Sequence, residues 1–358
     1  MSENKNLLAK KTFILALESH HKNDLQSAIN LYNEVLKIDP NYEEALYNLG
    51  IIHITLGDKQ KAKNYYEKAI IIDPNYINAY FNLGVISHEL SDYQRAKYCY
   101  EKVTDINPNH SNGHYNLGMI YNILGDNQKA KGCFEKVIDI DPNNLDAYNS
   151  LGITFQELGN YKKAIMSFEK AIIIDPNYIN AYNNIGLTFN SLGEYQKAIK
   201  YYEDIISINP DFWRSYYNLG LTYNSLYDHQ KAINCFAKVI EMHPTYVDAY
   251  NNLGLAFQQE QADQQKAIKF FQKAIEIDPT SIDAYHNLGN SFNNIGNFKK
   301  AINCYEKILE MGFAGKETLV EYGKTLLNIN EYKKGLKCIA QGQGVIKFMQ
   351  SGFKIIKQ

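Results

Sequence analysis

The eight prolines of this 358-residue chain are spaced with a regularity that few folds can accommodate. Successive prolines lie 34 residues apart six times and then 35 residues apart. A fixed period of this length indicates a stack of structural repeats, each of which contacts only its neighbours. The series consists of Pro40, Pro74, Pro108, Pro142, Pro176, Pro210, Pro244 and Pro279.

Small residues recur with the same step and suggest what each repeat contains. In residues 179–212, apolar residues recur at helical spacing on both sides of Gly193, which is expected to end a first helix. Pro210 is expected to end a second helix. Gly186 and Ala198 are small enough to let two helices approach closely. Each repeat is therefore predicted to be a pair of antiparallel helices.

The period slips once. Gly254 and Ala267 are 13 residues apart, whereas Gly220 and Ala232 are 12 apart. One extra residue therefore lies in the segment QQEQADQQ. We expect it to lengthen the turn between the two helices of that repeat.

The pattern YNLG, followed by alanine, an aromatic residue and Asp-Pro, resembles the tetratricopeptide repeat family. Residues 80–108 are one example, and the resemblance covers residues 9 to about 315 as nine units. It implies an all-α fold, a right-handed α-solenoid (superhelix) of antiparallel helix pairs with one concave groove. The aspartate of each Asp-Pro pair, such as Asp73, Asp141, Asp175 and Asp278, is expected to stabilise the turn between repeats.

Both ends of the chain depart from this pattern. Residues 1–8 are expected to form an N-terminal leader, and the first unit to present a polar outer face as a cap. A degenerate tenth helical unit is expected over residues 316–344, where Gly335 replaces the usual alanine. For the tail, residues 345–358, we expect either a short β-hairpin turning near Ser351-Gly352 or a capping helix.

The family resemblance implies that six positions of each unit line the groove: the second, fifth, sixth, ninth, twelfth and thirteenth. The sixth is asparagine in seven repeats, interrupted by Ser150. An asparagine amide both donates and accepts hydrogen bonds, so such a ladder can hold an extended peptide by its backbone. The ladder comprises Asn48, Asn82, Asn116, Asn184, Asn218, Asn252 and Asn287, with Asn183 and Asn251 beside it.

This ladder is similar to the groove of the O-linked N-acetylglucosaminyl transferases. Those enzymes carry a catalytic domain after their repeats, for which we expect no room in this chain. The alternative is that the asparagines serve helix packing, or reflect a composition that is rich in asparagine throughout.

Aromatic and cationic residues provide candidate anchors for a partner. Arg214 occupies an inward position beside Trp213, and both residue types are favoured at binding hot spots. Trp213 is equally well explained as a residue that fills space between units. The aromatic candidates, for each of which core packing is the alternative, are Tyr47, Phe81, Tyr115 and Tyr217.

Charge and hydropathy exclude several classes of function. Lys+Arg (37) nearly balance Asp+Glu (39), whereas a protein that binds nucleic acid through phosphate contacts would carry a basic surplus. No stretch approaches the roughly 20 apolar residues that span a bilayer, so membrane insertion is not expected. The N-terminus carries no secretory signature, and the expected location is the cytoplasm.

Catalysis and cofactors are not expected either. The five cysteines occupy the same place in their units, without the CxxC or Cys/His spacing of a zinc site. We expect them to be free, half-buried thiols. No arrangement of nucleophile and base can be defended, so we expect no enzyme, cofactor, metal or small-molecule substrate.

The sequence thus predicts a non-enzymatic scaffold or adaptor for other proteins, one component of a multi-protein complex. It would bind an extended peptide or a helix of its partner in the concave, asparagine-lined groove. The alternative is a permanently incorporated structural subunit of a large cytoskeletal, ciliary or cell-cycle assembly. A helical-repeat RNA binder is disfavoured by the period and the charge, while a regulatory subunit of an enzyme on another chain stays open.

Overall fold

The computed structural model describes residues 2–261, 263–313, 315–343, 345–349 and 352–356. These residues form twenty α-helices and two β-strands. The chain divides into two compact units, Met1–Ala181 and Tyr182–Gln358. Within each unit, consecutive helices pair, and the second helix of a pair also packs against the first helix of the next repeat. The all-α solenoid of antiparallel helix pairs is confirmed.

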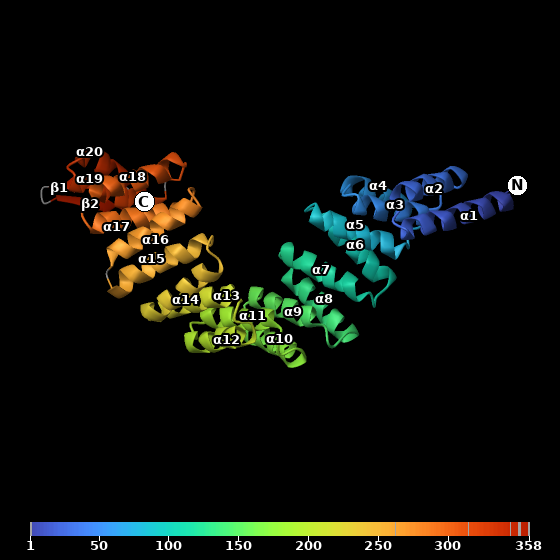
Figure 1. The fold of residues 1–358 in the computed structure, drawn as a ribbon, viewed down its shortest axis with the longest axis horizontal. Helices are drawn as coiled ribbons and strands as arrows, with labels where there is room; N and C mark the ends of the chain where they lie inside the picture. The colour runs from blue at the N-terminus through green and yellow to red at the C-terminus, as the bar shows by residue number, and fades with distance from the viewer. Residues whose placement is uncertain (1, 262, 314, 344, 350–351, 357–358) are drawn as a thin grey trace. The chain divides into compact units, whose positions relative to one another are not determined.

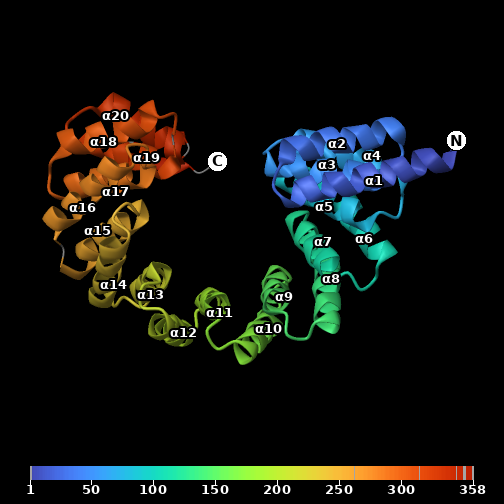
Figure 2. The same cartoon turned by 45° about the vertical axis from the view of Figure 1, so that its right-hand side comes forward.

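In the first unit the helices follow one another along the stack in chain order (Figure 1 and Figure 2). Its first helices are the odd-numbered ones and its second helices the even-numbered ones. They are α1 (Ser2–His21), α2 (Leu25–Ile38), α3 (Glu43–Thr55), α4 (Lys59–Ile72), α5 (Ile77–Glu89), α6 (Tyr93–Ile106), α7 (Ser111–Ile123), α8 (Asn127–Ile140), α9 (Leu145–Glu157) and α10 (Tyr161–Ile174).

The second unit continues the same alternation to the C-terminal end. Its helices are α11 (Ile179–Ser191), which begins in the last residues of the first unit, α12 (Tyr195–Ile208), α13 (Trp213–Ser225), α14 (His229–Met242), α15 (Val247–Gln261), α16 (Gln264–Ile277), α17 (Ile282–Asn294), α18 (Phe298–Glu310), α19 (Lys316–Asn328) and α20 (Tyr332–Gln343). The strands β1 (Val345–Met349) and β2 (Gly352–Ile356) follow α20.

Short polar contacts fix where the helices begin and where the repeats join. The Asp58 carboxylate accepts a hydrogen bond from the backbone N–H of Lys61 at 3.0 Å, which caps the start of α4. A cap of this kind stabilises a helix by about 0.5–2 kcal/mol. At the joints, the aspartate before proline accepts the backbone N–H two residues later, as expected for Asp73, Asp141, Asp175 and Asp278.

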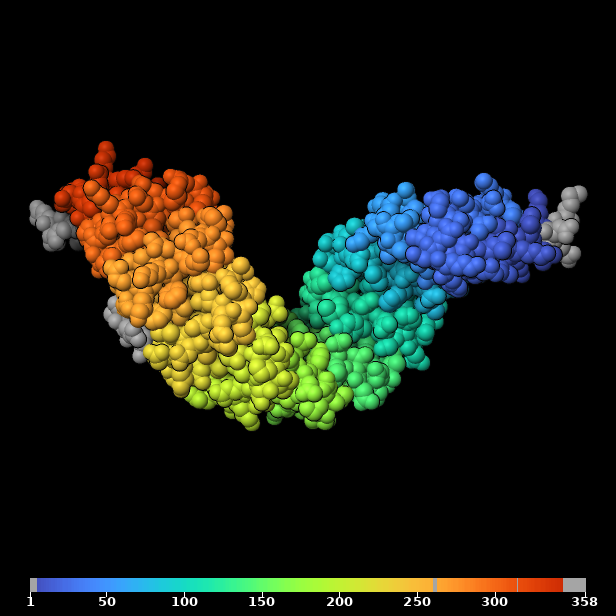
Figure 3. Space-filling model, viewed as in Figure 1, coloured from blue at the N-terminus to red at the C-terminus, as the bar shows by residue number. Residues whose placement is uncertain are grey.

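The recurring glycine is required by the packing inside each repeat. A Cβ on Gly186 would lie 2.6 Å from Cε1 of Tyr202, a distance that real Cβ atoms do not reach. Tyr202 is fully buried between the two helices, and so is Ala198. The close approach predicted from Gly186 and Ala198 is therefore confirmed. The space-filling view shows the repeats of each unit in close contact along the stack (Figure 3).

The extra residue of the eighth repeat lengthens a helix, so the prediction of a longer turn was wrong. The helix α15 has 15 residues, whereas α13 and α17 each have 13. Most other repeats place a glycine with a left-handed backbone after the first helix, such as Gly193 at φ 73°. The segment QQEQAD has no glycine, and its glutamines favour the helical conformation.

The C-terminal tail forms the β-hairpin and not the capping helix. β1 pairs with β2 in antiparallel register, with Phe348 opposite Phe353. Both strands lie against α20. The predicted turn residue Ser351 lies outside the described residues. In the tenth repeat, a Cβ on Gly335 would lie 2.8 Å from the carbonyl oxygen of Gly323, which explains why glycine replaces alanine there.

The N-terminal end also differs from expectation. α1 begins at Ser2, so the residues expected to form a leader lie almost entirely within this helix. The outer side of α1 was expected to be polar. Four aliphatic side chains are instead about half exposed: Leu7, Leu8, Ile14 and Leu15.

Candidate partner-binding face

The fourteen residues expected to bind a partner all lie on first helices, from α3 to α17. We call the surface formed by the second, fifth, sixth, ninth, twelfth and thirteenth positions of these helices the first-helix face. Arg214 is exposed, and the other thirteen candidates are half-buried. Ser150, which interrupts the asparagine series, is only 6 % exposed.

The asparagine ladder makes contacts between neighbouring repeats. In each case the sixth residue of one first helix approaches the fifth residue of the preceding first helix. Asn218 Nδ2 donates to Asn183 Oδ1 at 2.9 Å, and Asn287 Nδ2 donates to Asn251 Oδ1 at 2.9 Å. The partner is a tyrosine hydroxyl for Asn82 (Tyr47, 3.2 Å) and for Asn252 (Tyr217, 3.2 Å).

Three further positions of the ladder vary this arrangement. At Ser150 the hydroxyl lies 3.3 Å from the Tyr115 hydroxyl, so a shorter side chain makes the same inter-repeat contact. Asn116 lies near the hydroxyl of Tyr100, a ring of the preceding repeat, and acts against the burial that raises the pKa of this hydroxyl. Asn48 donates to the carbonyl of Glu44 in its own helix at 2.7 Å.

A single hydrogen bond between repeats uses only part of the hydrogen-bonding capacity of an asparagine amide. The group has two N–H donors and a carbonyl oxygen with two lone pairs. Asn218, for example, commits one donor to Asn183 and remains half exposed. The ladder therefore positions its own amide groups, and a ligand would meet side chains whose orientation is already fixed.

The aromatic candidates pack against rings within their own repeat. The ring of Tyr47 lies 5.1 Å from that of Tyr76 and 5.6 Å from that of Tyr66. Burial raises the pKa of Tyr47. The same kind of contact holds Phe81 (against Tyr100 and His110), Tyr115 (against Phe134) and Tyr217 (against Phe236 and Tyr246).

Trp213 and Arg214 open α13 and contact each other. The Arg214 guanidinium lies over the Trp213 ring at 5.0 Å. Trp213 packs in turn against His243 at 5.0 Å and Tyr246 at 4.7 Å, at the end of the same repeat. Trp213 thus fills space beside the connector, while Arg214 projects into solvent.

A second polar contact between repeats was not predicted. We call it the seam pair: the twelfth residue of one first helix and the tenth residue of the next. Asn190 Nδ2 donates to Thr222 Oγ1 at 2.9 Å, and the Thr222 hydroxyl donates to the carbonyl of Asn218 at 2.7 Å. Equivalent bonds join Asn122 to Thr154 and Gln258 to Ser291.

The seam pairs involve two residues at the twelfth position, which the family resemblance assigns to the groove. Asn190 and Gln258 lie on first helices as expected, but they contact the following repeat. The hydroxyl residues of the pairs are buried, at 0 % for Thr154 and Ser291 and 1 % for Thr222. A signal was present in the sequence, because the tenth position is isoleucine at Ile86 and Ile120 and afterwards is threonine or serine in every repeat except the eighth, which has Ala256.

An aliphatic row accompanies the amides on the first-helix face. The ninth residue of each first helix from α3 to α15 is aliphatic or methionine. None of these side chains is fully buried, and each is partly exposed. Ile153 is 37 % exposed in the first unit and Leu187 is 40 % exposed in the second. The row consists of Ile51, Val85, Met119 and Ile153 in the first unit, and Leu187, Leu221 and Leu255 in the second.

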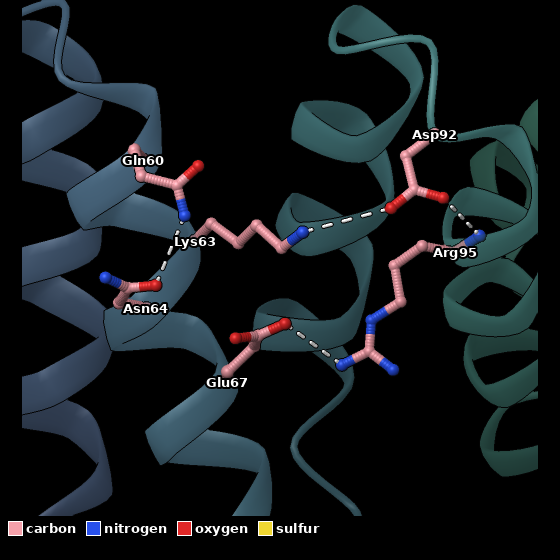
Figure 4. A network of polar contacts seen from close by, with 6 residues as sticks. All are labelled: Gln60, Lys63, Asn64, Glu67, Asp92 and Arg95. Atoms are coloured by element: carbon pink, nitrogen blue, oxygen red, sulfur yellow. Dashed lines mark hydrogen bonds and ion pairs between the residues drawn. The ribbon is translucent and has the colours of Figure 1, made fainter.

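The second helices carry ion pairs that link neighbouring repeats. Figure 4 shows Glu67 on α4 facing Arg95 on α6, with the carboxylate 3.3 Å from the guanidinium. Lys63 lies 3.9 Å from Asp92, which also caps α6 by accepting the backbone N–H of Arg95. Partly exposed pairs of this kind each stabilise a protein by about 0–1 kcal/mol. They orient repeats and do not form a reactive site.

The cysteines are free, as expected, but four of the five are buried and not half-buried. Cys133 is the half-buried one. Burial raises the pKa to about 12 for Cys99, Cys133, Cys235 and Cys304. These groups stay protonated at neutral pH and are poor nucleophiles. Among the described residues, no cluster of three or more His, Cys, Asp or Glu side chains could hold a metal ion.

Two hollows lie on the surface of the second unit. One of about 270 Å³ lies on the first-helix side between α17 and α19, where His286 Nδ1 is 3.2 Å from the Thr318 hydroxyl. Another of about 470 Å³ lies between α12 and α14 and is lined by charged residues such as Glu203 and Lys231. In the part of the chain that is described, no helix is both long and apolar enough to cross a membrane.

Comparison with known proteins agrees with this architecture. Profiles of the tetratricopeptide repeat match residues 110–175, 179–212, 214–280 and 270–303. Residues 13–141 match the middle TPR-like domain of cilia and flagella-associated protein 70. No curated protein matches the chain.

Two solved structures, from Parabacteroides merdae and Cytophaga hutchinsonii, share the fold. A tetratricopeptide repeat protein from Parabacteroides merdae is 20 % identical, with a TM-score of 0.56 over 70 % of this chain and 98 % of that one. The C-terminal part of a TPR repeat-containing protein from Cytophaga hutchinsonii is also 20 % identical, with a TM-score of 0.55 over 67 % and 98 %. MamA is 32 % identical, with a TM-score of 0.42 over 46 % of this chain and 95 % of that one.

Repeats of this kind serve in general as non-catalytic scaffolds for protein–protein interaction. The 34-residue period, the paired helices, the glycine–aromatic contacts and the profile matches lead to one assignment. This chain belongs to the tetratricopeptide repeat family.

Proposed function

We propose that the chain is a scaffold that binds a segment of a partner protein on its first-helix face. The observation that carries the proposal is the row of partly exposed aliphatic residues bordered by amides, which recurs in each unit. Aliphatic side chains provide apolar area, and the amides bind peptide groups whatever the sequence of the ligand. An extended segment or one face of a helix offers both kinds of group.

The inter-repeat hydrogen bonds of the ladder favour this function. Asn218 and Asn287 are held by Asn183 and Asn251, so a ligand does not have to order them. A face that is ordered before binding loses less conformational entropy in the complex. Arg214, exposed on α13, would add a cation for an acidic residue of the partner.

The test compares two pairs of substitutions that introduce the same charge. Ile153→Glu and Leu187→Glu place a carboxylate on the first-helix face, at side chains exposed enough to spare the core. Ile71→Glu and Ile173→Glu place it on the second helices α4 and α10, where the side chains are 77 % and 72 % exposed. Circular dichroism checks that all variants fold.

Partners recovered from native extract and crosslinked to the chain then decide the question. We expect the first-helix variants to lose partners that the second-helix variants keep, with crosslinks in the wild type mapping to first helices. Loss of the same partners in the second-helix variants alone would contradict the proposal.

A second candidate function is that of a permanent subunit of a ciliary or cytoskeletal assembly. It is supported by the match of residues 13–141 to the domain of cilia and flagella-associated protein 70. On this proposal a tagged chain resides in the cytoplasm and concentrates at the cilium. Extraction with high salt separates the two functions, because an adaptor is released from the insoluble fraction and an integral subunit is retained.

A further inference from the structure

We infer that the outer side of α1 is a self-association surface, which binds α1 of a second copy of this chain in antiparallel orientation. This inference is independent of the partner bound on the first-helix face. It begins from the four aliphatic residues Leu7, Leu8, Ile14 and Leu15, which are 53 %, 54 %, 54 % and 52 % exposed.

These four residues share one side of the helix. Residues three, four and seven apart in sequence lie on the same side of an α-helix, so positions 7, 8, 14 and 15 form a stripe. The opposite side carries Ala9, Phe13 and Ala16, which pack into the core of the first repeat. α1 is therefore apolar on two sides. A helix that packs on the core with one side and meets only water with the other would be apolar on the core side alone.

A comparison with the same positions of the next repeats indicates that such a stripe packs against another helix. Leu15 occupies the seventh position of its unit, and the residues at that position in the next repeats, Leu49 and Leu83, are 0 % exposed. They are covered because α3 and α5 pack against the second helix of the preceding repeat. Among the described residues, no helix covers α1 in this way, although α1 has the apolar residues for it.

The charges on the stripe select the partner and its direction. Lys11 and Glu18 lie on the same side as the aliphatic residues and are exposed. An antiparallel pair centred between Ile14 and Leu15 places Lys11 of each copy opposite Glu18 of the other. A two-fold axis makes this contact twice, as in other self-complementary interfaces.

Other arrangements of two such helices are disfavoured. A parallel pair would oppose Lys11 to Lys11 and Glu18 to Glu18. An antiparallel pair centred on Lys11 would bring the two ammonium groups together at the axis. In the favoured register Leu8 and Leu7 lie opposite the C-terminal end of α1 in the other copy, where the aliphatic stem of Lys22, the residue after that helix, can cover them.

A charge-exchange experiment tests both the surface and the direction. The full-length chain is examined by sedimentation equilibrium over a series of concentrations, as the wild type and as Lys11→Glu and Glu18→Lys. We expect a concentration-dependent dimer for the wild type. Each single variant should dimerise at least tenfold more weakly, because both contacts become like-charge pairs. An equimolar mixture of the two variants should regain the dimer.

Two controls keep the result interpretable. Lys5→Glu makes the same change of charge on α1 but off the stripe, and it should dimerise like the wild type. Ile14→Asp should abolish the dimer while circular dichroism stays unchanged. A wild type that is monomeric throughout the series, or a mixture of variants that stays monomeric, overturns the inference. So does binding of a different protein to this side of α1 while the chain itself stays monomeric.

Discussion

The contact between neighbouring first helices is made differently in two regions of the molecule. In the early repeats the seam positions hold isoleucine, and Ile86 and Ile120 are 2 % and 0 % exposed. Later most of them hold hydroxyl residues, such as Thr222, which is bonded to an amide of the preceding repeat; the eighth repeat has Ala256 instead. Both kinds of residue are buried in the same register of the same fold.

The difference shows that one backbone geometry accepts two sources of stability. A buried isoleucine stabilises through apolar area and close packing, which tolerate many apolar neighbours. A buried hydroxyl paired with an amide contributes less in net terms, but it requires one particular partner. The apolar region should therefore be the more stable of the two, and the polar region the more selective.

The largest effect is expected from breaking the apolar region. Ile120→Ala should lower the free energy of unfolding by about 2–5 kcal/mol, because it leaves a cavity at a fully buried site. Ile123→Ala in the same helix should change it by less than about 1 kcal/mol, since that side chain is 45 % exposed. Urea unfolding monitored by circular dichroism measures both. Equal losses for the two variants would contradict the role assigned to Ile120.

A smaller loss is expected from breaking a seam pair. Thr222→Val should lower stability by about 1–3 kcal/mol, because the Asn190 amide loses a buried partner. Replacing both residues, with Asn190→Leu as the second change, should restore much of that loss. The measurement is a double-mutant cycle, and additive losses would mean that the two side chains are not coupled.

Moving the polar pair into the apolar region would sharpen the comparison. Ile120→Thr alone should destabilise the chain, because it buries a hydroxyl group at a fully buried site whose seam position in the preceding repeat, the twelfth of α5, is His88 rather than an amide. Adding His88→Asn recreates the residues of a seam pair and should regain about 0.5–1.5 kcal/mol. Adding His88→Ala instead is the matched control and should regain nothing.

Acid should lower the free energy of unfolding of the early repeats, which contain His20 and His53, by a small amount. Burial lowers the pKa of His53 below 6.5, as does the charge of Lys61, and burial also lowers the pKa of His20. The unfolded chain therefore binds these protons first. The stability that depends on keeping these histidines neutral is fully present above pH 6.5. It is lost as the pH falls from 6.5 through the pKa of the histidines in the folded state.

Hydrogen exchange can locate that loss along the chain. Amides of α3 should lose protection between about pH 7.5 and about pH 5.5, after correction for the intrinsic rate, and His53→Gln should reduce the loss. Amides of α13 serve as the internal reference. An equal loss of protection in α13 would show that His53 is not the cause.

Features set by local chemistry could be predicted from the sequence. The helix pairs follow from apolar periodicity, and the turns follow from residues such as Asp73, whose carboxylate accepts the backbone N–H of Asn75. The close approach at Gly186 also follows, because only a missing side chain leaves room for Tyr202. In each case the residues that interact lie within one repeat.

Features that depend on the spacing between repeats could not be predicted. The sequence identified Asn218 as a residue of the ladder and the twelfth position, which Asn190 occupies, as part of the groove. It did not show that Asn218 bonds to Asn183 or Asn190 to Thr222. Those partners are 35 and 32 residues away, and the packing of two repeats decides which side chains meet. The exposed stripe on α1 was missed for a related reason, since only the structure shows what leaves Leu15 uncovered.

The caps and turns described above have a consequence for how such a chain can change in length. Asp58 caps a helix of its own repeat, and Asp73 closes a turn of its own repeat, so a duplicated 34-residue segment carries its turn chemistry with it. Whole repeats can then be inherited, lost or copied as modules. The seam pairs restrict which repeats can be neighbours. The repeat that carries Thr222 needs a preceding repeat with an amide at the position of Asn190, because the buried hydroxyl would otherwise lose its partner.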